Sequence, residues 1–263
     1  MSKGRFIMLW FSVLLFLLGG MMCAYPYAKG FMLEQEMRQD TQNFLSDIQL
    51  PVVEATVPKV SVLPTETSYP EEETAPAAPR EHEQLWYQMQ SYNQRIFLEG
   101  QSGLSNRNAY EKPSFRLSDY GLTTEVFGIL SIPSLGVEMP LYLGATEEHM
   151  AAGAAIMSQT SLPIGGINTN SVIAGHRGWK GADYFLHVDH LQPGDVVTIT
   201  NLWEKITYQV VEIKIIAPQD VEAIYIRPNQ ELITLLTCHP PATGGRQRYL
   251  VFCERVQTET EVS

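Results

Sequence analysis

Thr234-Leu235-Leu236-Thr237-Cys238 ends an apolar run that begins at Glu231, and it places one thiol at the C-terminal end of a predicted strand. A short apolar run bounded by polar and turn-forming residues is typical of a buried strand. A cysteine in a protein core usually behaves as a small hydrophobic side chain, whereas one held on rigid backbone beside polar neighbours is placed for chemistry. We therefore take Cys238 as a candidate nucleophile and ask which other groups lie at strand ends.

Two further predicted strands carry groups that could assist a thiol. The apolar run 171–175 leads into Gly175 and His176, and Arg248 opens the run 248–253. A cysteine, a histidine and an arginine at the ends of three strands can converge on one edge of a small sheet. We expect His176, Cys238 and Arg248 to do so.

The remainder of the second half of the chain also has a strand pattern. Short alternating segments are separated by Gly, Pro and Asn turns, which predicts an all-β barrel or sandwich with a few helical connections. The expected strands are 127–132, 139–143, 171–175, 195–202, 205–216, 231–238 and 248–253, and the expected helices are 147–155 and 183–190.

The N-terminal sequence is typical of a membrane anchor. Lys3 and Arg5 precede an uncharged run, 6–23, that is about long enough to span a bilayer. Cations before the run predict that the N-terminus lies inside the cell and the rest of the chain outside. The residues after the run fit a signal-peptidase site poorly, which favours an uncleaved anchor, and a cleaved signal peptide is the alternative.

Between the anchor and the strands we expect a stalk and one helix. Residues 34–50 could form a short polar helix, whereas 51–79 is rich in proline, threonine and acidic residues and cannot form a packed core. Apolar residues at helical spacing then predict an amphipathic helix that ends near Gly100, namely Leu85, Met89, Tyr92 and Ile96. The expected parts are an anchor (1–30), a stalk (31–80), a helix and loop (81–126), a catalytic unit (127–257) and a polar tail (258–263).

Together these motifs resemble the sortases, the cysteine transpeptidases that attach proteins to the surface of Gram-positive bacteria. The resemblance covers 127–255 and rests on the TLLTC run, the Arg-x-Leu-Val strand and the earlier Gly-His pair. The segments 127–133 and 160–166 are similar to class C, pilus-assembling sortases. Two features depart from that class: no Asp-Pro-aromatic lid motif is present, and no second apolar helix follows the Arg strand. Residues 108–115 stand where the lid would be, so the sequence predicts a lidless pilus sortase.

The resemblance implies a fold and a mechanism. It implies a closed β-barrel that cleaves a Leu-Pro-x-Thr-Gly signal between Thr and Gly, holds the product as a thioacyl group on Cys238, and passes it to an amine. His176 would protonate the departing amine and deprotonate the incoming one. Arg248 cannot act as a base, so its role would be electrostatic. Thr237, Ala174 and Gly175 would contact the substrate.

The acceptor remains open at this point. A class C enzyme would use a lysine on another pilin, and a housekeeping sortase would use the peptidoglycan precursor. An extracellular cysteine protease would use water, and an inactive surface scaffold would form no thioacyl group. The sorting motif, the pilin partners and the oligomeric state do not follow from the sequence.

Several competing interpretations concern neighbouring residues. Arg246 should share a strand face with Arg248, although Arg248 fits the Arg-x-Leu-Val pattern, and Arg177 is a third arginine that we expect to be a surface charge. His239 either tunes the thiolate or faces solvent. Cys253 lies in an apolar strand, which indicates a core residue.

The formal net charge of −11 argues against nucleic-acid binding, and we expect no metal and no cofactor.

Overall fold

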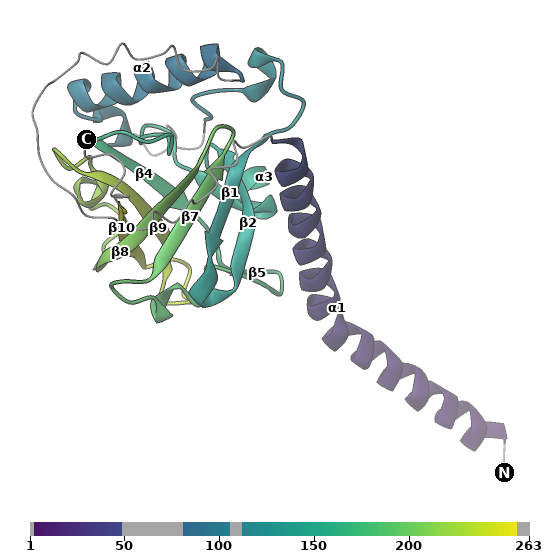
Figure 1. Cartoon of the computed structure of the whole chain (residues 1–263). Helices are drawn as coiled ribbons and strands as arrows, with labels where there is room; N and C mark the ends of the chain where they lie inside the picture. The colour runs from purple at the N-terminus through teal and green to yellow at the C-terminus, as the bar shows by residue number, and fades with distance from the viewer. Residues whose placement is uncertain (1–2, 49–80, 106–111, 257–263) are drawn as a thin grey trace, which may run out of the picture.

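A computed structural model describes residues 3–48, 81–105 and 112–256, which form a closed β-barrel with two long helices outside it (Figure 1). The eight barrel strands are hydrogen-bonded in the order β1-β2-β3-β4-β9-β10-β8-β7. Their bounds are Val126–Ile132 (β1), Val137–Leu143 (β2), Ala154–Ile156 (β3), Thr169–Ala174 (β4), Glu231–His239 (β9), Gln247–Arg255 (β10), Lys205–Ile216 (β8) and Val196–Asn201 (β7). The expected closed barrel is confirmed.

Strand β9 lies between β4 and β10 and determines which residues share an edge. It runs parallel to β4, with Ala174 opposite Leu236, and antiparallel to β10, with Arg248 opposite Cys238. The end of β4, the end of β9 and the beginning of β10 therefore meet at one edge of the barrel, as the three strand-end residues required.

Both predicted helical connections differ from the structure. The first is a helix only over Glu147–Ala152 (α3), and the residues after Gly153 form β3. The second, 183–190, is wrong: Arg177–Trp179 (β5) and Ala182–Tyr184 (β6) form a hairpin, and only Val188–His190 is a short 3-10 helix. Lys180 and Gly181 both have positive φ, as a tight two-residue hairpin turn requires. Tyr184, inside the expected helix, has a φ of +46°, which a right-handed helix does not allow.

The two faces of the strands bury different apolar sets. Because side chains alternate along a strand, Leu235 and Val251 point into the barrel whereas Leu236 and Leu250 point outward. The outward set is covered by the connection between β8 and β9, which includes the 3-10 helix Val221–Ile224. We call it the outer apolar cluster, and its buried members are Leu104, Met157, Val172, Ala174, Ile224, Leu250 and Phe252.

The amphipathic helix is confirmed as Glu83–Glu99 (α2), which ends at Gly100 in a left-handed conformation. It lies across one end of the barrel (Figure 1). Its buried face includes Asn93, whose side-chain amide donates to the Leu162 carbonyl at 2.9 Å and accepts from the Leu162 amide at 2.8 Å. This pair of bonds attaches α2 to the segment between β3 and β4.

The N-terminal helix is longer than the sequence indicated. It runs without interruption over Lys3–Asp47 (α1), so the polar helix expected over 34–50 is present up to Asp47 and continues directly from the apolar run. Met37, Thr41 and Phe44 are buried against the barrel at helical spacing, a short amphipathic stripe that the sequence analysis overlooked. The expected stalk residues 49–80 lie outside the described part of the chain.

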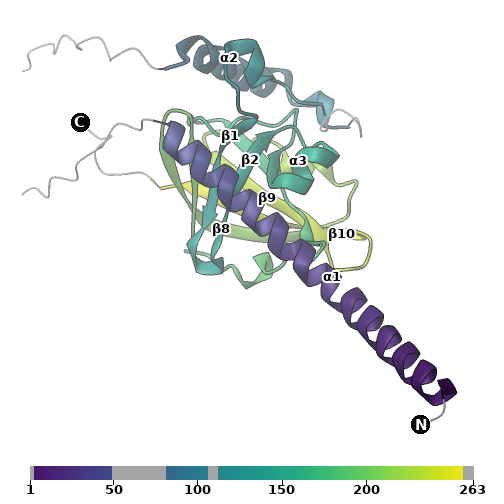
Figure 2. The same ribbon diagram turned by 90° about the vertical axis from the view of Figure 1, so that its right-hand side faces the viewer.

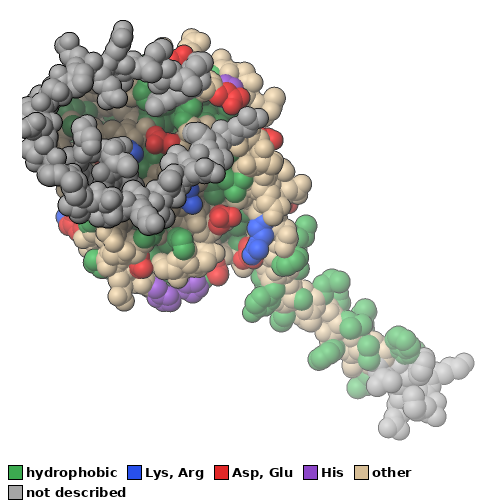
Figure 3. Space-filling model, in the orientation of Figure 1, with side chains coloured by type: hydrophobic (Ala, Val, Ile, Leu, Met, Phe, Trp, Pro, Cys, Tyr) green, Lys and Arg blue, Asp and Glu red, His purple; other side chains and the backbone are tan. Residues whose placement is uncertain are grey.

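Helix α1 packs along the barrel with its C-terminal half and projects from it with its apolar N-terminal half (Figures 1 and 2). It contacts β1, β2, β6 and α3. Figure 3 shows hydrophobic side chains around the projecting part, which is long and apolar enough to cross a membrane. Pro26 lies inside the helix, where it lacks the amide that would donate to the preceding turn.

Candidate active site

The thiol of Cys238 and the guanidinium of Arg248 face each other across β9 and β10. The two residues are directly opposite in the register, and Cys238 is exposed. Gly245 lies against both groups, since a Cβ atom there would come within 3.0 Å of the Cys238 sulfur and 2.9 Å of Arg248 Nη1. Arg248 Nη1 also donates to the Gly245 carbonyl at 2.7 Å, which holds the guanidinium beside the thiol. The sequence analysis did not identify Gly245, although the Gly-Gly pair at 244–245 was a signal of close backbone approach.

His176 follows β4 at the same edge. Because Ala174 pairs with Leu236 and the Gly175 amide donates to the Leu236 carbonyl at 3.1 Å, the chain stays beside β9 up to the level of the thiol. The imidazole is half-buried and stacks on Trp179, with ring centroids 4.4 Å apart and planes within 10°. Burial lowers the pKa of His176, and the nearby Lys180 ammonium lowers it further. The ring is therefore favoured in its neutral form, which can accept a proton.

The residues expected to contact substrate have different positions. Ala174 belongs to the outer apolar cluster, on the same face as the thiol. Thr237 is buried on the opposite face, and its hydroxyl donates to the Gly175 carbonyl at 2.7 Å. The Thr237 hydroxyl therefore ties β9 to the residue before His176, and it does not reach the face that carries the thiol. A side chain at Gly175 would overlap the ring of Phe185, so glycine is required there.

The competing arginines are now distinguishable by position. Arg246 is exposed in the loop before β10, whereas Arg248 lies within the strand. Arg177 is buried, contrary to the expected surface charge, and its Nη2 lies 2.8 Å from Asp189 Oδ1. Its Nη1 lies 3.2 Å from Nδ1 of His239, which must accept because an arginine has no acceptor. His239 is half-buried and is paired with Arg177, so it does not simply face solvent.

The other thiol of the barrel is a core residue. Cys253 is fully buried, and burial raises the pKa of its thiol far above the ordinary value. It pairs with Ile233 in the register, away from the strand end that carries Cys238, and both cysteines are free. The interpretation of Cys253 as a core residue is confirmed.

The outer apolar cluster leads along β4, β9 and β10 toward the thiol. Leu104, from the 3-10 helix Ser102–Ser105, is part of this cluster. The Gln101 side chain holds this turn, since its amide nitrogen donates to the Gln159 carbonyl and its oxygen accepts from the Ile226 amide at 2.6 Å. Residues 106–111 lie outside the described part of the chain, so half of the expected lid position, 108–115, is not described.

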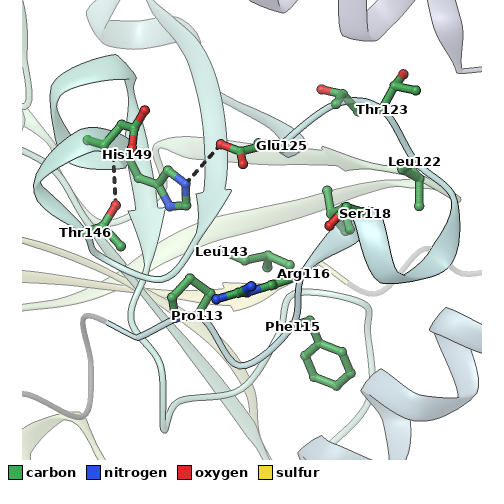
Figure 4. Close-up of a pocket in the computed structure, with 13 residues that line it drawn as sticks. Pro113, Phe115, Arg116, Ser118, Leu122, Thr123, Glu125, Leu143, Thr146 and His149 are labelled. Carbon is green, nitrogen blue, oxygen red and sulfur yellow. Dashed lines mark hydrogen bonds and ion pairs between the residues drawn. The ribbon is translucent and has the colours of Figure 1, made fainter.

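A separate cavity of about 400 Å³ lies between the segment that precedes β1 and α3 (Figure 4). It contains Arg116, Glu125 and His149, a set that could suggest a second reactive site. The ring of His149, however, bonds through Nδ1 to the Gly144 oxygen at 2.9 Å and stacks on Tyr142. Its Nε2 lies 3.6 Å from Glu125. Both ring nitrogens of His149 thus have local polar partners, and the residues that line this cavity include no cysteine.

Comparisons with known proteins agree with this arrangement. A model of the sortase domain matches residues 130–256. Among curated proteins, sortase D of Bacillus subtilis (strain 168) is 25% identical over 158 residues, covering 59% of this chain and 77% of that protein. Sortase A of Streptococcus agalactiae serotype III (strain NEM316) is 29% identical over 137 residues, covering 51% of this chain and 54% of that protein.

Solved structures show the same relationship over the whole barrel. Sortase C1 of GBS pilus island 1 is 30% identical, with a TM-score of 0.61, and the match covers 67% of this chain and 89% of that one. Sortase A from Corynebacterium diphtheriae is 25% identical, with a TM-score of 0.59, and the match covers 68% of this chain and 86% of that one. The thiol and guanidinium at one strand edge, the imidazole that follows the neighbouring strand β4 and these matches lead to one conclusion: the chain belongs to the sortase family of cysteine transpeptidases.

Proposed function

We propose that this chain is a pilus-assembling sortase with Cys238 as nucleophile, His176 as proton-transfer group and Arg248 as electrostatic stabiliser. The observation that carries the assignment is that the strand ends that bear or precede these three residues share one edge of the barrel, namely the ends of β4 and β9 and the beginning of β10. The pilin acceptor is supported by the similarity to sortase C1 of GBS pilus island 1 and to a pilus-related sortase C of group B Streptococcus.

The first half of the reaction forms a thioester. The sulfur of Cys238 attacks the carbonyl carbon of the Thr-Gly bond in a Leu-Pro-x-Thr-Gly-type signal, and the C–N bond breaks. The thiol proton passes through His176 to the departing amine, which the lowered pKa of the imidazole permits because the resting ring is neutral. The Arg248 guanidinium stabilises the negative charge that develops on the carbonyl oxygen.

The second half transfers the acyl group. A lysine amine of another pilin attacks the thioester carbonyl, the C–S bond breaks, and a proton of the amine returns through His176 to the sulfur. Two partly exposed residues beside the outer apolar cluster support this substrate class: Leu236 precedes Cys238 on the same face of β9, and Ile216 pairs with Arg248. An apolar surface next to the thiol suits the Leu-Pro end of the signal. The projecting half of α1 would anchor the enzyme, with the barrel outside the membrane.

A comparison of acceptors tests the proposal. The purified enzyme would be incubated with a sorting-signal peptide and equal concentrations of a pilin-derived lysine peptide and a peptidoglycan stem peptide, and products would be identified by mass spectrometry. We expect the lysine peptide to be joined preferentially. Preference for the stem peptide would indicate a housekeeping sortase, release of free acid alone would indicate a protease, and absence of a thioacyl adduct would indicate an inactive scaffold.

A further inference from the structure

We propose that α1 is part of the active-site framework as well as a membrane anchor: its contact at Gly30 holds the β5–β6 hairpin, and Trp179 on that hairpin positions the His176 ring. Trp179 is a positioning residue here, because it acts through the imidazole. The inference rests on the proposed function in taking His176 as the proton-transfer group.

The contact between α1 and the hairpin is a close backbone approach. A Cβ atom at Gly30 would overlap the carbonyl group of Gly181, and a Cβ atom at Gly181 would overlap the carbonyl oxygen of Pro26. Gly181 also has a φ of +92°, a backbone conformation that residues with a side chain rarely adopt. Glycine is thus required on both sides, and the turn of the hairpin lies directly against the helix.

The base of the hairpin is attached to the barrel through the paired guanidinium of Arg177 and the buried Ala182 and Tyr184, so the glycine contact acts at the tip of the hairpin. Beside it lies a cavity of about 550 Å³ between α1 and the hairpin, lined by residues that include Lys29, Met32, Trp179 and Lys180. Because this space is not filled by side chains, packing around it does not fix the turn. Tyr184 anchors the other strand, since its hydroxyl donates to the Ala151 carbonyl at 2.6 Å. Trp179 packs on the main core and pairs with Ala182 beside the turn, so the glycine contact at the turn helps to fix its position.

Trp179 in turn restrains the imidazole. The indole and the His176 ring are nearly parallel at 4.4 Å, and the Tyr184 ring meets the imidazole edge-on at 5.9 Å. These two aromatic rings, one from each strand of the hairpin, fix the plane of the imidazole and remove it from water. Cys238 lies on β9, beside the chain that leads from β4 to His176, so a rotation of the ring would change its distance to the sulfur.

The charged groups around the ring determine the direction of the effect. Lys180 lies over the Trp179 ring, with its ammonium 4.8 Å from the centroid, and α1 contributes Lys29 and Glu36 to the cavity wall. Burial is the main cause of the lowered His176 pKa and Lys180 is the second, so loss of the stacking raises this pKa by admitting water.

The experiment uses the full chain in lipid nanodiscs and compares two glycines of the same helix. In Gly30→Ala the added methyl displaces the hairpin, whereas Gly20→Ala is the matched control, since nothing lies within 4 Å of a Cβ atom at Gly20. Trp179→Ala and Trp179→Phe are measured alongside. The His176 pKa is read by NMR, with His176→Gln to assign the signal, and kcat/KM is measured as a function of pH with a sorting-signal peptide.

We expect Gly30→Ala and Trp179→Ala to raise the His176 pKa, to move the pH profile in the same direction, and to lower kcat/KM about tenfold, since a small misplacement of a reacting group can cost up to about 10²-fold. Trp179→Phe should restore most of the downward His176 pKa shift and most of kcat/KM. Gly20→Ala should match the wild type in both quantities. An unchanged His176 pKa in Gly30→Ala would overturn the link to α1. A raised pKa with an unchanged pH profile would instead contradict the role of His176 in the proposed function and leave the link intact.

Discussion

At the scale of single residues, chemistry and packing assign opposite roles to the two thiols of the barrel. Cys238 is exposed opposite a guanidinium, whereas Cys253 is fully buried among apolar side chains that raise its pKa. The same comparison separates the two arginines near the start of β10, of which only Arg248 lies against the thiol.

The first prediction concerns the thiols. Cys238→Ala should abolish the thioacyl adduct and all product, because no other described thiol lies at this strand edge. Cys253→Ala should leave kcat/KM within about twofold and lower the free energy of unfolding by about 1 kcal/mol, as is usual for a small buried deletion. Cleavage of a fluorogenic sorting-signal peptide and urea denaturation measure the two effects. Loss of activity in a folded Cys253→Ala protein would contradict the assignment.

The second prediction concerns the arginines. Arg248→Ala should lower kcat/KM by about 10²- to 10³-fold, the scale of losing one oxyanion-stabilising group. Arg246→Ala is the matched control, since it removes an exposed guanidinium two positions away, and it should cost less than about threefold. Steady-state kinetics on both variants provide the comparison, and the reverse order would transfer the role to Arg246.

At the scale of elements, the site depends on how separate segments are attached to β9 and β4. Thr237 ties β9 to Gly175, and Asn93 ties α2 to Leu162 in the connection that leads into β4. Both attachments use a polar side chain to satisfy backbone groups that are buried. Their loss leaves those groups unpaired, which is costlier than the loss of one exposed hydrogen bond.

The third prediction tests the attachment of α2. Asn93→Ala should lower the free energy of unfolding by about 1 to 3 kcal/mol, because the Leu162 amide and carbonyl lose their partner in a buried setting. Gln94→Ala, which changes the exposed neighbouring position, should change it by less than about 0.5 kcal/mol. Urea denaturation of residues 81–263 measures both. Equal decreases in the free energy of unfolding for the two variants would mean that the hydrogen bonds of Asn93 make no specific contribution to stability.

At the scale of the whole molecule, closure of the barrel determines which groups solvent can reach. The inner faces of all eight strands share one core, so a residue such as Cys253 becomes accessible only when the barrel opens as a unit. Cys238 lies outside that core and is exposed while the barrel is intact.

The fourth prediction follows from this difference. Iodoacetamide should modify Cys238 in the native protein, whereas Cys253 should react more slowly by a factor on the order of 10³ or more, because its exposure requires global unfolding. Mass spectrometry of digests over a time course gives both rates. Slow labelling of Cys238 that becomes fast in Leu104→Ser would indicate that the 3-10 helix Ser102–Ser105 covers the thiol, and the lidless interpretation would then be wrong.

The sequence by itself determined the strand pattern, the apolar anchor, the amphipathic helix and the three strand-end residues, because these depend on local periodicity and on short motifs. It did not determine the hairpin over 177–184, which depends on two positive φ angles, or the joining of the apolar run and the polar helix over 34–50 into one uninterrupted helix, α1. The burial of Arg177 and the contact between Gly30 and Gly181 were decided only by the tertiary structure. Each depends on residues that are far apart along the chain. A local sequence pattern does not indicate which distant residues a charged side chain or a glycine will contact.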